Sequence, residues 1–279
     1  MRYTSTRDHS VNVSFEQALT SGYAPGGGLF VPAEFNLAKF STEDLRRWKA
    51  LSYAELAYEI MRRFISVDEI SDGDLRQIFA DSYSDFEREE IVPVVPLKLD
   101  DENSKVYVSE LFHGPTYCFK DLGMKACVNL LAYFGFKRKR RTTLVVSTTG
   151  DTGPAAMHAV CGLPEKVKPY LNILVHFPKG QISKLQRRQL TCIDSPNARV
   201  VAFEGGGDDM DIPIKRILLA SHSGDNVLCG INSYNIGRPL TQMVHFVWTY
   251  LRVAEREHLE VGDSVQMVDI VLPTGELSV

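Results

Sequence analysis

The chain has 279 residues, of which 44% are hydrophobic and 24% charged, and this is the composition of a globular protein with a core of ordinary size. Its 31 basic and 35 acidic side chains leave a net charge of −4, which argues against a general nucleic-acid-binding protein. No apolar run approaches the roughly 20 residues that cross a bilayer. The N-terminal residues lack the apolar stretch of a secretion signal, so we expect a cytoplasmic protein that does not enter a membrane.

The five cysteines are scattered, odd in number and without the spacing of metal ligands. We expect most of them to be reduced core residues, and we expect no metal site. Cys118 lies two residues before Lys120, a candidate functional lysine, but a packing role is favoured for this cysteine as well.

Residues 1–92 are predicted to form a small, mainly helical first domain. Ser14 is a good helix-capping residue and opens a short helix, and amphipathic patterns over residues 41–64 and 72–83 predict further helices. The glycine-rich run over residues 24–32 has no Walker lysine and no helix after it, so it is interpreted as a turn that leads into a strand rather than as a phosphate loop.

Residues 93–279 alternate between strand and helix patterns, which predicts an α/β fold with a mostly parallel sheet and helices on both faces. The predicted strands are 105–110, 142–147, 172–177, 199–203, 226–231 and 266–272. The predicted helices are 121–136, 153–161, 183–191, 210–222 and 238–258. Ligands of such sheets bind at the carboxyl ends of the strands.

Lys120 lies where a predicted strand gives way to a predicted helix, after the break at Gly114 and Pro115. The positive end of the helix dipole disfavours a cation at this position. The residue is therefore either a lysine that acts as a Schiff-base nucleophile or an ordinary lysine of the first helical turn.

The loop over residues 147–154 follows a buried strand and is rich in threonine and glycine. Its backbone N–H groups, at the start of a helix, could bind an anion such as a substrate carboxylate. The alternative is an N-cap without a ligand, because threonine and aspartate also cap helices well.

The basic run over residues 137–141 is the sharpest charge cluster in the chain. It could be a nuclear-localisation signal or an anion-binding patch. We favour a structural interpretation, since cations are favourable at the C-terminus of a helix and the run lies between a helix and a strand.

Several of these segments resemble threonine synthases, which are fold-type II pyridoxal phosphate (PLP) enzymes. The segment Gly-Pro-Thr-x-x-Phe-Lys-Asp around Lys120 resembles their cofactor lysine segment, and residues 147–153 resemble their Thr-Ser-Gly-Asp-Thr-Gly loop. Residues 22–32 resemble a run in their N-terminal domain, and residues 231–238 resemble their Asn-Ser-Ile-Asn-Trp-Ala-Arg segment. The resemblance extends over residues 1–275.

The resemblance implies PLP as the cofactor and an incomplete fold-type II fold. The implied cofactor-binding residues are Lys120, which is also the catalytic residue, Phe119, Asp151, Thr274 and Gly275. The implied substrate-binding residues are Thr148, Thr149, Gly150, Asp151, Thr152, Asn232, Ser233 and Arg238.

The last of these segments departs from the family pattern, with Tyr234 in place of isoleucine and Ile236-Gly237 in place of Trp-Ala. Arg238 either pairs with a substrate phosphate or caps the helix that begins there. The departure looks more like the animal threonine synthase-like branch. That resemblance implies a phospho-lyase that removes phosphate from a small phosphohomoserine- or phosphothreonine-like substrate and gives a 2-oxo acid and ammonia.

The family's phosphate loop begins at Thr274-Gly275, but here Glu276 follows and places a negative charge where a dianion would bind. We therefore expect a truncated form, such as a splice form, whose activity is open. The alternative function is a catalytically inactive binding protein, or a signalling protein secreted without a signal peptide. An exposed sheet edge would then suit a homo-oligomer or a protein partner.

Overall fold

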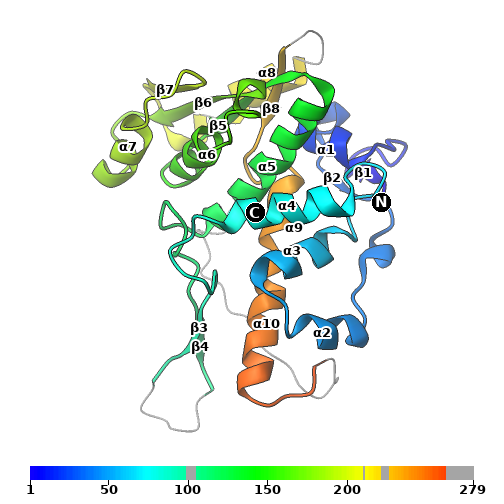
Figure 1. The fold of residues 1–279 in the computed structure, drawn as a ribbon. Coiled ribbons are helices and arrows are strands. Elements are labelled where there is room, and N and C mark those ends of the chain that lie inside the picture. Colours follow the sequence, from blue (N-terminus) through cyan, green and yellow to red (C-terminus); the bar gives the residue numbers. More distant parts are fainter. Residues whose placement is uncertain (99–104, 210, 221–225, 262–279) are drawn as a thin grey trace.

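The computed structural model describes residues 1–98, 105–209, 211–220 and 226–261 (Figure 1). The described strands form two small antiparallel sheets and one four-stranded parallel sheet. None of the helices within these ranges combines the length and apolar character needed to cross a membrane.

The first 83 residues are mainly helical, as predicted. Their helices begin at serines that accept hydrogen bonds from backbone N–H groups in the first turn, and three of these serines form complete capping boxes. The elements in order are β1 (Tyr3–Ser5), α1 (Phe15–Ser21), the 3₁₀ turn η1 (Pro25–Gly27), β2 (Phe30–Pro32), η2 (Phe35–Ala38), α2 (Thr42–Trp48), α3 (Tyr53–Met61) and α4 (Asp72–Tyr83).

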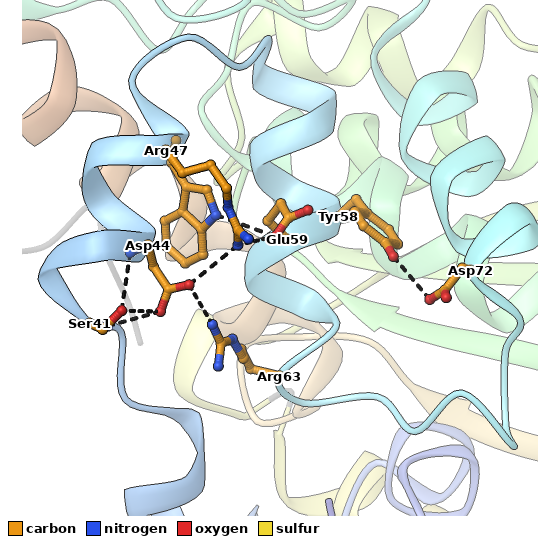
Figure 2. Close-up of polar contacts among 8 residues, drawn as sticks. Ser41, Asp44, Arg47, Tyr58, Glu59, Arg63 and Asp72 are labelled. Carbon is orange, nitrogen blue, oxygen red and sulfur yellow. Dashed lines mark hydrogen bonds and ion pairs between the residues drawn. The ribbon is translucent and has the colours of Figure 1, made fainter.

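The single helix predicted over residues 41–64 is wrong, because the chain forms two helices there. Ser52 begins a new capping box with Glu55, and this ends the first helix before the second starts. A polar cluster joins the two helices (Figure 2). Its ion pairs run from Arg63 to Asp44 at 2.7 Å and from Arg47 to Glu59 at 2.9 Å.

The predicted strand at residues 105–110 exists but is not part of the parallel sheet. It is β4 (Tyr107–Ser109), which pairs antiparallel with β3 (Val94–Pro96) in a hairpin that extends away from the sheet (Figure 1). The Tyr107 hydroxyl donates a hydrogen bond to Glu257, which follows the last described helix. The alternation of strand and helix patterns suggested a strand of the parallel sheet. Because β3 and β4 are close in the sequence, they pair directly with each other as antiparallel strands instead.

The main sheet confirms the predicted α/β fold. Its strand order is β7-β6-β5-β8, and all of its pairings are parallel. The strands are β5 (Arg141–Ser147), β6 (Leu171–Pro178), β7 (Ala198–Phe203) and β8 (Asn226–Gly230). The further strand predicted at 266–272 lies outside the described residues.

The helices of this part are α5 (Lys120–Arg138), α6 (Thr152–Cys161), α7 (Lys184–Thr191), α8 (Asp211–Ala220), α9 (Gly237–Gln242) and α10 (Val244–Arg256), with 3₁₀ turns η3 (Lys168–Tyr170) and η4 (Gly207–Asp209). Helix α5 is buried on most of its surface and packs against α4, α6 and α9, between the sheet and the N-terminal helices (Figure 1). The single helix predicted over 238–258 is interrupted at Met243, where the N–H of Phe246 bonds to the carbonyl three residues back.

The apolar core runs from the N-terminal helices into the sheet. One cluster of buried side chains includes Phe15 and Trp48 from the first segment and Phe134 and Val146 from the second. The division of the chain at residues 92 and 93 stays a prediction.

Candidate cofactor-binding site

Lys120 is the first residue of α5, and its side chain is only 9% exposed. Its Nζ lies 2.9 Å from Oδ2 of Asp151 and 4.2 Å from the centre of the Phe119 ring. Asp151 comes directly before α6, at the carboxyl end of β5. The structure therefore brings together the lysine and the loop that the sequence singles out separately.

The turn before Lys120 is held by Asp121, which is fully buried. Its two carboxylate oxygens accept hydrogen bonds from the backbone N–H of Thr116 at 2.8 Å and from the Thr116 hydroxyl at 2.7 Å. Gly114 leaves room for this carboxylate, because a Cβ there would lie 2.6 Å from it. Tyr117 takes a left-handed backbone conformation with φ of 59°, so the chain turns sharply just ahead of the lysine.

Asp151 also contacts Cys118, whose Sγ lies 3.1 Å from the same Oδ2. Burial, reinforced by the nearby carboxylate, raises the pKa of Cys118 to about 12, so the thiol is a neutral hydrogen-bond donor. Burial also raises the pKa of Asp151, but the hydrogen bonds from Lys120 and Cys118 outweigh it and leave the carboxylate pKa below its ordinary value. Asp151 is therefore an anion held between an amine and a thiol. Position alone favoured packing for Cys118, and only the fold shows this contact.

The loop after β5 is shaped by Thr148, which is buried. Its hydroxyl accepts hydrogen bonds from the N–H groups of Gly150 and Gly153, both at 3.0 Å, and so caps α6 in place of Asp151. The N–H groups of Thr149 and Thr152 have no acceptor among the described residues. These two donors at a helix N-terminus can receive an anion. A side chain in place of Gly150 would meet Gln186 at 2.6 Å, so the loop needs glycine for close packing.

Asn232 fastens the carboxyl end of β5 to the segment after β8. Its Oδ1 accepts from the N–H of Ser147 at 3.2 Å, and its Nδ2 donates to the Ser147 carbonyl at 2.8 Å. The Ser147 hydroxyl in turn lies 2.9 Å from Nε2 of His176. The amide of Asn232 is thus occupied by the backbone, while the side chain of the half-buried Ser233 beside it has no hydrogen-bond partner among the described residues.

Arg238 is 2% exposed, and its guanidinium points back to the end of β8. It donates to the carbonyl of Ile231 at 3.0 Å and to Oε1 of Gln242 at 3.3 Å. Its Nε has no hydrogen-bond partner within the described part of the chain. Burial lowers the pKa of Arg238, and the nearby Asp151 opposes this shift. Both predicted roles, phosphate contact and cap of its own helix, stay predictions.

Comparison with known proteins gives the same family as the motifs. A family described as "Threonine synthase N terminus" matches residues 2–83. Threonine synthase-like 2 of Rattus norvegicus is 37% identical over 276 residues, which cover 99% of this chain and 54% of the rat protein. Threonine synthase-like 2 of Mus musculus is 38% identical over 277 residues, with the same two coverages.

Solved structures agree. The yeast threonine synthase structure has a TM-score of 0.79 and 32% identity, over 90% of this chain and 50% of that one. The chain belongs to the threonine synthase family. The PLP-bound threonine synthase of Brucella melitensis has a TM-score of 0.78 and 31% identity, over 96% of this chain and 53% of that one.

This threonine synthase family chain spans about half the length of the curated relatives it matches. The predicted family and fold class are confirmed. The roles of the individual site residues stay predictions, although Phe119, Lys120, Asp151 and the loop 148–152 do lie together. The predicted phosphate-loop residues Thr274 and Gly275 lie outside the described residues.

Proposed function

We propose that this chain binds PLP through Lys120 and acts as a phospho-lyase on an O-phosphorylated amino acid. The observation that carries the proposal is the 2.9 Å contact between Lys120 Nζ and Asp151, beside a loop with free backbone N–H donors. The Brucella relative, a threonine synthase, is described as PLP-bound, which supports the same cofactor here.

The residues present fit this cofactor. A primary amine that is 9% exposed is accessible enough to condense with an aldehyde and dry enough to keep the bond from hydrolysis. The aromatic ring of Phe119 lies against the amine and gives a flat apolar wall. Asp151 fixes the direction of the amine, and Cys118 holds Asp151 in turn.

When bound, PLP withdraws electrons from the α-carbon of an amino acid. The N–H groups of Thr149 and Thr152 orient the substrate carboxylate in this scheme. The amine of Lys120 then takes the proton from the α-carbon, and phosphate leaves from the β- or γ-carbon with the electrons of its C–O bond. Water releases the products as a 2-oxo acid and ammonia, whereas addition of water to the side chain gives threonine.

The test is chemical trapping. The purified chain is incubated with PLP, reduced with borohydride, digested and mapped by mass spectrometry, and we expect one adduct per chain at Lys120. The Lys120→Ala variant should give no adduct, while Lys39→Ala, which removes an exposed lysine without a described partner, should be labelled like the wild type. A wild-type chain that shows no adduct, or an adduct spread over surface lysines, contradicts the proposal.

Phosphate release tests the reaction separately from cofactor binding. We expect O-phosphohomoserine or O-phosphothreonine to release phosphate with the wild type, and at least about 100-fold more slowly with Lys120→Ala, since this variant loses the proton acceptor. Labelling of Lys120 without phosphate release from either compound would refute the phospho-lyase and favour the alternative of a binding or secreted signalling protein.

A further inference from the structure

A cavity lies where the strands of the main sheet begin, away from Lys120. Its volume is about 310 Å³, and it is lined by the charged residues Arg141, Glu165 and Lys168 together with Pro169, Asn172, Pro196 and Asn197. Arg141 is the first residue of β5 and Ser147 the last, so about 20 Å of strand separates this cavity from the candidate cofactor site. Its volume is at the lower end of the range for small-molecule sites.

The pairing of the strands explains why these side chains meet. Asn172 pairs with Thr143 in the neighbouring strand, and paired residues point to the same face of a sheet. Arg141 lies two residues before Thr143 and therefore shares that face. Asn197 forms a fixed wall, because its Nδ2 donates to the Leu171 carbonyl at 2.9 Å.

The guanidinium of Arg141 is available to a ligand. Three other members of its basic run have side-chain contacts: Lys137 donates to the Glu69 carbonyl, Arg138 pairs with Glu16 at 2.7 Å, and the Lys139 ammonium lies 3.6 Å from the centre of the Phe136 ring. The Arg141 guanidinium, in contrast, has no hydrogen-bond or ion-pair partner among the described residues.

The second cation of the cavity is available to a ligand. The side chain of Lys168 is 21% exposed and pairs with Glu165 at 2.6 Å, but Glu165 is 88% exposed. Ion pairs with so exposed a partner contribute little free energy, so an anion that enters the cavity can replace Glu165 as the partner of the ammonium group. The side chain of Asn172 has no hydrogen-bond partner among the described residues and supplies a further donor.

We propose that this cavity binds the phosphate group of a small phosphomonoester. A planar guanidinium gives two parallel N–H donors that match phosphate oxygens, and the ammonium supplies the second positive charge that a dianion needs. A cavity of about 310 Å³ is larger than a phosphate group, and the rings of Pro169 and Pro196 give apolar walls for an organic body. The site does not depend on PLP or on the proposed phospho-lyase activity.

The test is a titration of the ¹⁵N-labelled full chain with glycerol 3-phosphate, with inorganic phosphate and glycerol as separate arms at constant ionic strength. We expect saturable shifts of the amide signals of Arg141, Lys168 and Asn172. Weaker binding of inorganic phosphate, and none of glycerol, would show that the phosphate group is required and that the organic body adds affinity.

Variants locate the binding. Arg141→Gln and Lys168→Gln should each weaken binding about tenfold or more, the worth of a charge-assisted hydrogen bond. Arg46→Gln, which removes an exposed charge on α2 without a described partner, should leave it unchanged. The proposal is overturned if Arg141→Gln binds within twofold of the wild type, or if the shifts occur at the 148–152 loop instead. Binding that survives Lys120→Ala separates this site from the proposed cofactor site.

Discussion

The polar cluster between α2 and α3 and the polar cluster around Lys120 are built in opposite ways. In the first, Asp44, whose side chain is 12% exposed, receives hydrogen bonds from Ser41 and ion pairs with Arg47 and Arg63, whose side chains are 58% and 35% exposed (Figure 2). Burial raises the pKa of Asp44, but these contacts outweigh it and lower the pKa below its ordinary value of 3.8. Its contacts are near in the sequence, with at most 19 residues between partners.

At the site, Asp121 is fully buried, and other polar pairs join residues that are distant in the sequence. Lys120 and Asp151 are 31 residues apart, and Asn232 and Ser147 are 85 apart. Burial raises the pKa of Asp121 above 3.8, and the hydrogen bonds from Thr116 do not outweigh it. The difference shows that the helical segment is stabilised by ion pairs between residues near in the sequence, whereas the site also depends on polar pairs that only the tertiary fold assembles.

The largest expected effect on stability is therefore at Asp121, which is fully buried. Asp121→Ala leaves two donors of Thr116 without an acceptor next to Lys120, and we expect the free energy of unfolding to fall by about 3 kcal/mol. Asp121→Asn keeps an acceptor oxygen of similar shape and should cost roughly half as much. Urea unfolding at neutral pH measures both. A loss below about 1 kcal/mol for Asp121→Ala would mean that the turn before the lysine is held by other contacts.

The same comparison explains what the sequence could predict. Local signals were sufficient for the capped helices at Ser14 and Ser41, and alternation of strand and helix predicted the parallel sheet. Motifs predicted that Lys120 and the 148–152 loop share a site, and these segments do meet. The helix predicted over 41–64 was wrong because its amphipathic pattern continues across a second capping box.

Contacts between distant segments could not be predicted from the sequence. Nothing in its local pattern shows that Cys118 donates to Asp151, that Asn232 is occupied by the backbone of Ser147, or that Arg238 is buried against the end of β8. The hairpin formed by β4 was missed for the same reason, because a short strand carries no signal for its partner. These features follow from register and packing, which depend on the whole chain.

A smaller effect on stability, with a distinctive pH dependence, is expected at Asp44. Because the folded-state pKa of Asp44 is lowered, its contribution is present above pH 3.8 and is lost as the pH falls through the folded-state pKa. Asp44→Asn should therefore lower the free energy of unfolding by about 1 kcal/mol at pH 7, and the difference from the wild type should shrink below pH 3.8. Urea unfolding across this pH range measures it.

Asp121 is the matched control for the direction in which stability changes with pH. Its folded-state pKa is raised, so the stabilisation that comes from this shift is present below pH 3.8 and is lost as the pH rises through the folded-state pKa. The difference between wild type and Asp121→Asn should move with pH in the direction opposite to that of Asp44→Asn. Parallel pH profiles for the two variants would contradict the contrast between the clusters.

The smallest effect is expected at Arg47, although it makes two ion pairs. Its side chain is 58% exposed, and each of its partners keeps another contact: Asp44 keeps Arg63 at 2.7 Å, and Glu59 keeps the indole N–H of Trp48 at 3.3 Å. Arg47→Gln should therefore change the free energy of unfolding by no more than about 0.5 kcal/mol, and by less in 1 M salt. Urea unfolding at low and high salt tests this. A loss near that of Asp121→Ala would mean that the cluster between α2 and α3 is a cooperative network, in which the exposure of Arg47 does not limit its contribution.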